Sequence, residues 1–135
     1  MANGTAGSDR RRTDRVAAAV VDAAMKVHSA LGPGLLESAY EACLAHELRR
    51  RGHAVRTQAP LAIEYDGVRV EVGYRLDLLV DDVVIVELKT VANVLPIHTA
   101  QLLSYLKLGA CRVGLLMNFH ALHLRDGITR MVHRF

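Results

Sequence analysis

The stretch RLDLLVDDVVIVELKT, residues 75–90, most constrains the fold because it places charged side chains inside two apolar runs. A pair of aspartates between the runs is typical of a turn, so we expect two antiparallel strands that are neighbours. Asp77, Glu87 and Lys89 lie within those strands. Because charged side chains are rarely buried without a partner, these residues predict either a compensating ion pair or a bound ion.

Strand geometry brings the three charged side chains together. Glu87 and Lys89 are two residues apart, so their side chains project from the same face of the sheet. Antiparallel pairing about the aspartate turn places Asp77 within about one residue of Glu87. Two converging carboxylates repel each other, and Mg²⁺, or Mn²⁺ in its place, can be held by such a pair. Lys89 can orient a water or stabilise charge on a phosphate, so the group fits phosphodiester hydrolysis.

The same three residues have a structural interpretation of equal weight. A buried lysine paired with Glu87 or Asp77 would compensate the charges without any ion. The spacing of Asp77, Glu87 and Lys89 is a loose pattern with many chance matches. Residues elsewhere in the chain must therefore decide between an ion pair and a metal site.

A carboxylate on a helix predicted over residues 35–51 favours the metal site. Glu37 heads a stripe that continues with Tyr40 and Leu44 at helical spacing, so we expect it to face the core. Glu37 could then reach over the sheet to the metal or its waters. It could also close a capping-box bond with Gly34 as the N-cap, and the two roles are compatible.

A further helix, predicted over residues 96–109, carries a polar face. His98, Gln101 and Tyr105 are spaced at i, i+3 and i+7, so they lie on one side of the helix. The helix follows the Glu87–Lys89 strand after a short connection, and this face could border the site. Taken alone, such a stripe is more often merely solvated.

The remaining patterns predict one α/β domain. The 135-residue chain suits a single compact domain, which we expect over residues 13–135 behind a mobile tail of residues 1–12. Arg10, Arg11 and Arg12 end that tail, either as solvated cations or as an arm that contacts phosphate.

The hydrophobic periods predict the element order α-α-β-β-β-β-α-β-β-β, with a mixed central β-sheet flanked by helices. A first helix is expected over residues 13–31, in addition to the two named above. Strands are expected over residues 54–58, 61–65, 68–80, 83–90 and 112–119, and a C-terminal hairpin over 122–135. Asp66-Gly67 is predicted to be a hairpin turn, and Gly73 a bulge.

Composition narrows the functional classes. A hydrophobic content of 51% excludes a disordered chain, and 4% aromatic residues with no Trp disfavour a stacking platform for single strands. The formal charge of +3 permits contact with phosphates without demanding it. The chain has no signal-peptide pattern and no run that could span a bilayer, so we expect a soluble cytoplasmic protein that does not bind membranes. Cys43 and Cys111 lack metal or redox spacing and are expected to be reduced, mostly buried thiols.

Several segments together resemble the small bacterial GxxExxY protein family, which is grouped with the PD-(D/E)XK nuclease superfamily. The segments, which occur in order, are LGPGLLESAYEACLAHELRRRG, YRLDLLV, VIVELKT, HTAQLLSYLKL and RVGLLMNF. The first contains the G-x-x-E-x-x-Y motif as Gly34, Glu37 and Tyr40. The resemblance covers roughly residues 16–133, nearly the whole predicted domain.

The resemblance implies a restriction-endonuclease-like core with a divalent metal site. Asp77, Glu87 and Lys89 match the catalytic residues of the superfamily motif, and Glu37 matches the acid of an early helix. The implied metal ligands are Glu37, Asp77, Glu87 and the carbonyl oxygen of Leu88. No proline precedes Asp77, which is a common departure from the pattern.

The substrate side of the site is also implied by the resemblance. Gln101 and Tyr105 match the Q-x-x-x-Y element of the RecB-like branch, which lies beside the bound nucleic acid. With His98 on the same face, they form the predicted substrate-binding residues.

Three hypotheses follow. The favoured one is a Mg²⁺-dependent nuclease that acts on nucleic acid, with DNA as the expected substrate. The second is a binding or regulatory module on a nuclease fold that does not cleave alone and works with a partner protein. The third is a structural domain in which Glu87 and Lys89 form a core ion pair. A homodimer through an edge strand in the C-terminal hairpin is compatible with each.

Overall fold

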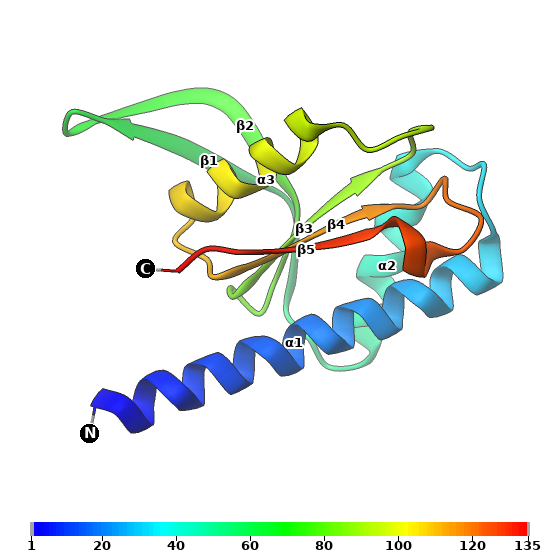
Figure 1. Ribbon diagram of the computed structural model, residues 1–135, viewed down its shortest axis with the longest axis horizontal. Coiled ribbons are helices and arrows are strands. Elements are labelled where there is room, and N and C mark those ends of the chain that lie inside the picture. The colour runs from blue at the N-terminus through cyan, green and yellow to red at the C-terminus, as the bar shows by residue number, and fades with distance from the viewer. Residues whose placement is uncertain (1, 135) are drawn as a thin grey trace.

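A five-stranded mixed sheet forms the centre of the fold, with strand order β1-β2-β3-β4-β5. Figure 1 shows the computed structural model, which describes residues 2–134. β3 and β4 run parallel, and the other neighbouring strands pair antiparallel. The strands are β1 (Val55–Tyr65), β2 (Val68–Val80), β3 (Val84–Lys89), β4 (Val113–Asn118) and β5 (Ile128–Val132).

Helices cover both faces of the sheet. α1 (Ala2–Leu31) and α2 (Glu37–Arg50) pack on one face, and α3 (Pro96–Leu108) packs on the other. A short 3₁₀ helix, η1 (Leu124–Gly127), precedes β5. The predicted class, a mixed α/β sheet flanked by helices, is therefore confirmed.

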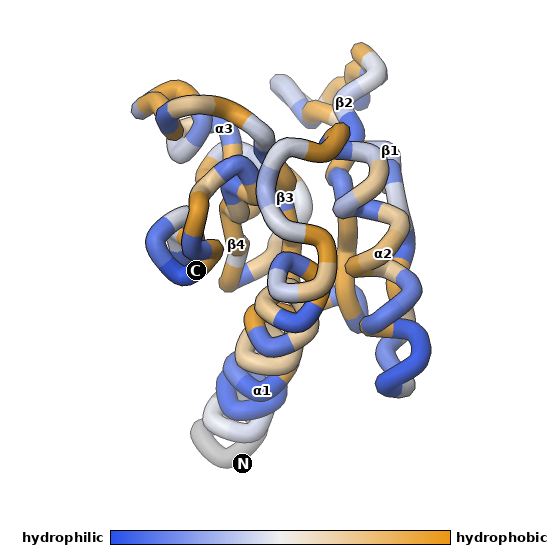
Figure 2. Tube along the Cα trace, turned by 90° about the vertical axis from the view of Figure 1, so that its right-hand side faces the viewer, coloured by the Kyte–Doolittle hydropathy of each residue, from blue (hydrophilic) through white to orange (hydrophobic). Residues whose placement is uncertain are grey.

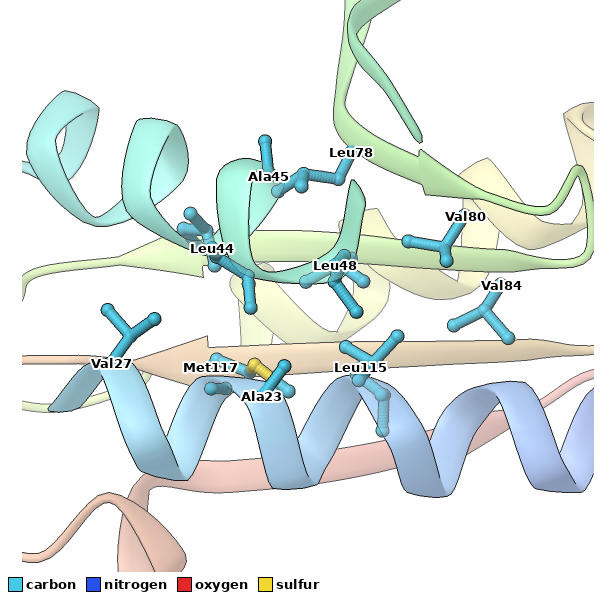
Figure 3. Close-up of a cluster of buried hydrophobic side chains, with 14 of the residues drawn as sticks. Ala23, Val27, Leu44, Ala45, Leu48, Leu78, Val80, Val84, Leu115 and Met117 are labelled. Carbon is cyan, nitrogen blue, oxygen red and sulfur yellow. The ribbon is translucent and has the colours of Figure 1, made fainter. Parts of the chain in front are cut away.

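The larger core lies between the sheet and the α1–α2 layer (Figure 3). α1 alternates between hydrophobic and hydrophilic residues along its length (Figure 2), as expected of a helix with one buried side. In β3, Val84, Val86 and Leu88 face this core, while Ile85 belongs to the core under α3. Because side chains alternate along a strand, Glu87 and Lys89 lie on the α3 side with Ile85.

The N-terminal segment, expected to be a mobile tail over residues 1–12, is helical from Ala2 onward. α1 begins at Ala2, and Met1 lies outside the described residues. Thr13, where the first helix was expected to begin, lies inside α1, and its hydroxyl donates to the carbonyl oxygen of Asp9 at 3.0 Å. Residues 2–12 contain no proline, so nothing interrupts the helix before its buried part begins.

The strands predicted over residues 54–58 and 61–65 form the single strand β1. Pro60 is tolerated inside it because β1 is an edge strand, where a missing N–H need not break a ladder. The turn at Asp66-Gly67 and the bulge near Gly73 are confirmed. Gly73 has a φ of 82°, and the β1–β2 register shifts beside it.

The predicted C-terminal hairpin over residues 122–135 is wrong. Residues 124–127 form η1, and only β5 follows, paired with β4. Gly127 approaches the carbonyl oxygen of Asn118 so closely that an added Cβ would lie 2.6 Å from it. This contact of η1 with the end of β4 replaces the local turn that the Asp-Gly dipeptide suggested.

The two cysteines differ in burial. Cys111 is buried as predicted, whereas Cys43 is exposed. Cys43 lies on α2 between the inward-facing positions Tyr40 and Leu44, so its side chain points away from the core.

Candidate active site

Asp77 and Glu87 occupy facing positions on β2 and β3. The paired residues Leu78 and Val86 set the register, and the next step along both strands brings Asp77 opposite Glu87. The backbone N–H of Asp77 donates to Glu87 Oε1 at 3.4 Å, and that of Leu88 donates to Asp77 Oδ2 at 2.8 Å. The predicted convergence of the two carboxylates is confirmed. Where β2 and β3 diverge, the Asp77 side chain accepts the hydrogen bond from the Leu88 N–H.

Burial and repulsion leave Glu87 without charge compensation. Its exposed fraction is 6%, and burial, followed by the neighbouring Asp77 carboxylate, raises the pKa of Glu87 to about 9. Lys89 acts in the opposite direction, since its positive charge lowers the pKa of Glu87, but its effect is smaller. Among residues 2–134, no ion pair joins Lys89 to Glu87, so the core ion pair of the structural hypothesis is not formed.

Glu37 joins the same electrostatic environment from α2. Burial raises its pKa first, the charge of Asp77 raises it further, and the charge of Lys89 lowers it. Glu37 therefore lies close enough to Asp77 and Lys89 to respond to both. The charges of Glu37, Asp77, Glu87 and Lys89 therefore influence one another near the end of β3.

The G-x-x-E-x-x-Y motif explains how Glu37 is placed. Gly34 has a φ of 100°, which glycine adopts readily, and the Tyr40 hydroxyl donates to the Gly32 carbonyl at 2.5 Å. The same hydroxyl accepts a hydrogen bond from the backbone N–H of Leu35 at 3.1 Å. The buried Tyr40 thus ties the loop to the first turn of α2, and Glu37 is held at the start of that helix.

The expected capping-box role of Glu37 is wrong. The N-cap of α2 is Leu36, not Gly34, and no side chain caps the helix. Glu37 is the first residue of the helix, where the helix dipole favours a negative charge.

Gln58 and Glu41 belong to the site and were missed from the sequence. Gln58 Nε2 donates to Glu41 Oε1 at 2.5 Å and to Asp77 Oδ1 at 3.3 Å. Gln58 has a φ of 51°, an irregular backbone position that nothing in its strand-like sequence suggested. Glu41 had a usable signal, because it follows Glu37 by one helical turn.

Asn118 also supports the site and was missed. It is buried at the end of β4, and its side-chain amide donates to the Val91 carbonyl at 2.8 Å and accepts from the Val91 N–H at 3.1 Å. This pair of hydrogen bonds fixes the chain directly after Lys89. A polar residue at the end of the apolar run VGLLMN was the signal for it.

The predicted substrate-binding residues lie together in a groove of about 630 Å³ between α3 and the β1–β2 hairpin. His98, Gln101 and Tyr105 line it from α3, facing Ile63 and Tyr74 of the hairpin. The Tyr74 and Tyr105 rings are 6.1 Å apart. Burial raises the pKa of Tyr105 first, and the charge of Glu87 raises it further, so the groove borders the acids.

His98 also has a structural role. Its Nδ1 accepts a hydrogen bond from the backbone N–H of Leu95 at 3.0 Å, so His98 caps the N-terminus of α3. Nδ1 therefore carries no proton, and Nε2 is the nitrogen that can donate in the groove.

The donor set determines which metal the site fits. Among residues 2–134, no group of three or more His, Cys, Asp or Glu side chains is gathered as a metal site. The acids therefore do not form a closed cage of protein ligands. Mg²⁺ is commonly held by one or two carboxylates, with waters and substrate phosphate completing its shell, and the uncompensated Asp77–Glu87 pair fits that pattern.

The family comparison agrees with the fold. The profile of the PD-(D/E)XK nuclease superfamily matches residues 14–131, so the chain belongs to this superfamily. Proteins of this superfamily are typically nucleases. Neither the curated proteins nor the solved structures contain a match to the chain. In the described part of the chain, no helix has the length and apolar character needed to cross a membrane.

Proposed function

We propose that this protein is a divalent-metal-dependent nuclease that hydrolyses phosphodiester bonds in DNA. The proposal rests on the pairing of Asp77 with the buried Glu87, because two facing carboxylates without compensation are the side chains that a hard cation requires. Superfamily membership and the adjoining groove support it. The GxxExxY family assignment is part of the proposal, and Tyr40 gives that motif a physical meaning.

The residues of the site have different roles in the proposed mechanism. Asp77, Glu87 and the Leu88 carbonyl would hold Mg²⁺, which when bound would polarise the phosphate and lower the pKa of a coordinated water. Glu37 would hold that water or a second ion. Lys89 would stabilise the negative charge that develops on the phosphate oxygens.

The groove supplies the strand-binding part of the mechanism. Gln101 and the Nε2–H of His98 can donate to phosphate or base oxygens, and Tyr105 with Tyr74 offers aromatic surface to a base. The groove thereby holds the strand while the scissile phosphate lies at the acids. A base that has left its stack in the nucleic acid would pack against the rings of Tyr74 and Tyr105.

A binding or regulatory module is the second candidate function. It is favoured by one observation, that the described residues offer no complete protein cage for the metal. A partner protein, or a second copy joined through the edge strand β5, would then have to complete the site or hold the DNA.

The decisive experiment is a nuclease panel with metal omission. We expect wild type to cut DNA with Mg²⁺ or Mn²⁺ but not with EDTA, and Lys89→Ala to lose at least ~100-fold in rate, as expected for loss of a charge-stabilising group. The matched control is Lys26→Ala, which removes a lysine paired with Glu47 away from the site and should retain activity. RNA is included in the panel.

Two outcomes would contradict the nuclease. If wild type leaves single-stranded DNA, double-stranded DNA and RNA intact in every metal, the enzyme proposal fails. If it then still binds DNA in Ca²⁺ by gel shift, the binding module is correct instead. A Lys89→Ala protein as active as wild type would remove Lys89 from the mechanism.

A further inference from the structure

Four arginines from distant parts of the sequence line one groove at the opposite end of the sheet from the candidate active site. The groove has a volume of about 430 Å³ and lies between α1 and the edge strand β5. Its arginines are Arg10 of α1, Arg112 before β4, Arg130 of β5 and Arg134 after β5. We name it the arginine groove.

The charge of the arginine groove is almost uncompensated. Among the described residues of its lining, Asp14 is the only acidic one, and it forms an ion pair of 2.8 Å with Arg130. The remaining formal charge of the lining is +3, as large as the net charge of the whole chain. The arginine groove is therefore a strongly positive part of the protein surface.

The fold does not use these guanidinium groups. Among the residues that the structure describes, Arg130 is the only one of the four whose side chain has a hydrogen bond or ion pair. Arg51, directly after α2, in contrast binds both Glu47 and Asp22. Like charges brought together without internal partners repel, so their convergence makes sense when an anion occupies the groove.

The position of the groove separates it from the candidate active site. β3 and β4 run parallel, with Val84 paired to Val113 at one end and Lys89 paired to Asn118 at the other. Val113 lines the groove and Lys89 lies at the acids, so the two sites are roughly 16 Å apart along the strands. Arg10 belongs to the α1 layer on one face of the sheet, whereas the Glu87 side chain faces α3 on the other.

We propose that the arginine groove binds the phosphate backbone of nucleic acid outside the candidate active site. Guanidinium groups present forked donors that match phosphate oxygens, and several of them along one groove suit a repeating polyanion. Arg10 has the phosphate-contacting role that the basic N-terminal segment suggested. Arg12 does not, because its guanidinium donates to the carbonyl oxygen of Asp81 at 3.3 Å.

The test compares two double variants that remove the same charge. Arg112→Gln with Arg134→Gln empties the groove of two guanidinium groups, and Arg56→Gln with Arg125→Gln removes two exposed arginines elsewhere. Binding of a labelled DNA long enough to reach both sites is measured by fluorescence anisotropy in Ca²⁺ over a salt series. Melting temperatures show that both variants fold.

We expect the groove variant to bind about 10-fold more weakly and to lose about 1 in salt slope per arginine, whereas the control variant binds like wild type. Equal losses in the two variants, or no loss in either, would overturn the proposal. Binding of polyglutamate with the same affinity and the same loss would also overturn it, in favour of an acidic protein partner.

This proposal rests on the proposed function, because the arginine groove and the candidate active site would both bind nucleic acid. The experiments must therefore distinguish failure of the groove proposal from failure of the nuclease proposal. The groove variant should cut a saturating oligonucleotide too short to reach the groove at the wild-type rate, and Lys89→Ala should retain its affinity for long DNA. If wild type binds through the groove but never cuts, the groove stands and the nuclease fails. If it cuts long DNA and the groove variant binds normally, the nuclease stands and the groove fails.

Discussion

Two glutamates with almost the same exposed fraction have opposite electrostatic environments. Glu47 on α2 is 7% exposed and Glu87 on β3 is 6% exposed. Hydrogen bonds from Arg51 and Arg50, with Lys26 nearby, lower the pKa of Glu47 to about 2. Burial and the adjacent carboxylate instead raise the pKa of Glu87 to about 9.

The difference teaches how a structural acid and a site acid can be told apart. The charge of Glu47 is compensated inside the fold by three cations, so it needs no ligand. The charge of Glu87 is opposed by its nearest neighbour, so it becomes favourable only when a cation is supplied from outside. The exposed fraction alone would have assigned both residues to the same role.

The largest expected effect comes from making the same substitution at both positions. Glu87→Gln should lower DNA cleavage by at least ~100-fold, whereas Glu47→Gln should cut at a rate close to wild type while it remains folded, because only Glu87 would contact the metal. Mn²⁺ should raise the melting temperature of wild type and Glu47→Gln but not that of Glu87→Gln. Initial cleavage rates and thermal melts with and without metal measure both effects.

The proposed difference between Glu47 and Glu87 would be contradicted if Glu47→Gln and Glu87→Gln had the same effects. Equal loss of activity would mean that Glu47 also belongs to the site, or that both losses reflect damage to the fold. An unchanged metal response in Glu87→Gln would remove Glu87 from the ligand set.

The next effect is on stability without metal. Above its ordinary pKa of 4.5, Glu87 is ionised in the unfolded chain but stays protonated in the folded protein up to a pKa of about 9. The free energy of unfolding should therefore fall as pH rises through that interval, and Glu87→Gln should be more stable than wild type by about 1–3 kcal/mol at pH 7. Urea unfolding in EDTA across pH measures the difference.

Glu47→Gln should have the opposite effect on the free energy of unfolding. Glu47 is ionised in the folded protein down to a pKa of about 2, so its contribution is present above pH 4.5 and lost as pH falls below it. The variant should be less stable than wild type at pH 7 and lose less stability in acid. A Glu87→Gln protein that is destabilised at pH 7 would contradict the assigned environment of Glu87.

The smallest effect concerns the loop that places Glu37. Tyr40→Phe removes the hydroxyl that bonds the Gly32 carbonyl and the Leu35 N–H, and it should lower the free energy of unfolding by about 1–2 kcal/mol. Cleavage should fall by less than ~10-fold, because Glu37 would be held less firmly rather than removed. The matched control is Tyr65→Phe, which changes an exposed tyrosine and should alter neither quantity.

Tyr40→Phe sharpens the comparison because Tyr40 contributes no charge to the site. A loss of activity as large as that of Glu87→Gln would mean that the loop, not the acid pair, controls catalysis. Activity and stability equal to those of Tyr65→Phe would show that the hydrogen bonds of Tyr40 are dispensable.

Much of the sheet could be predicted because its signals are local. The Asp81-Asp82 turn and the alternation of the flanking strands determined that Asp77 meets Glu87, since register follows from turn position and side-chain period. The face formed by His98, Gln101 and Tyr105 followed from helical spacing in the same way. Helical spacing also placed Glu37 on the inward-facing stripe of its helix, and its role in the site remains a prediction.

The failures occurred where distant contacts override local signals. Asp126-Gly127 is a sound turn signal, but Gly127 packs on the Asn118 carbonyl and the chain forms η1 instead. Arg10 looked like part of a solvated tail, although α1 carries it to a groove with Arg112 and Arg134.

By itself, the sequence determined the strands around the Asp81-Asp82 turn, the facing carboxylates and the helix that carries Glu37, because each depends on spacing within one or two adjacent segments. Only the tertiary structure decided that Glu47 is neutralised by cations while Glu87 is not, and that four arginines share one groove. Charge compensation depends on distances between segments far apart in the chain, and those distances exist only once the layers have packed.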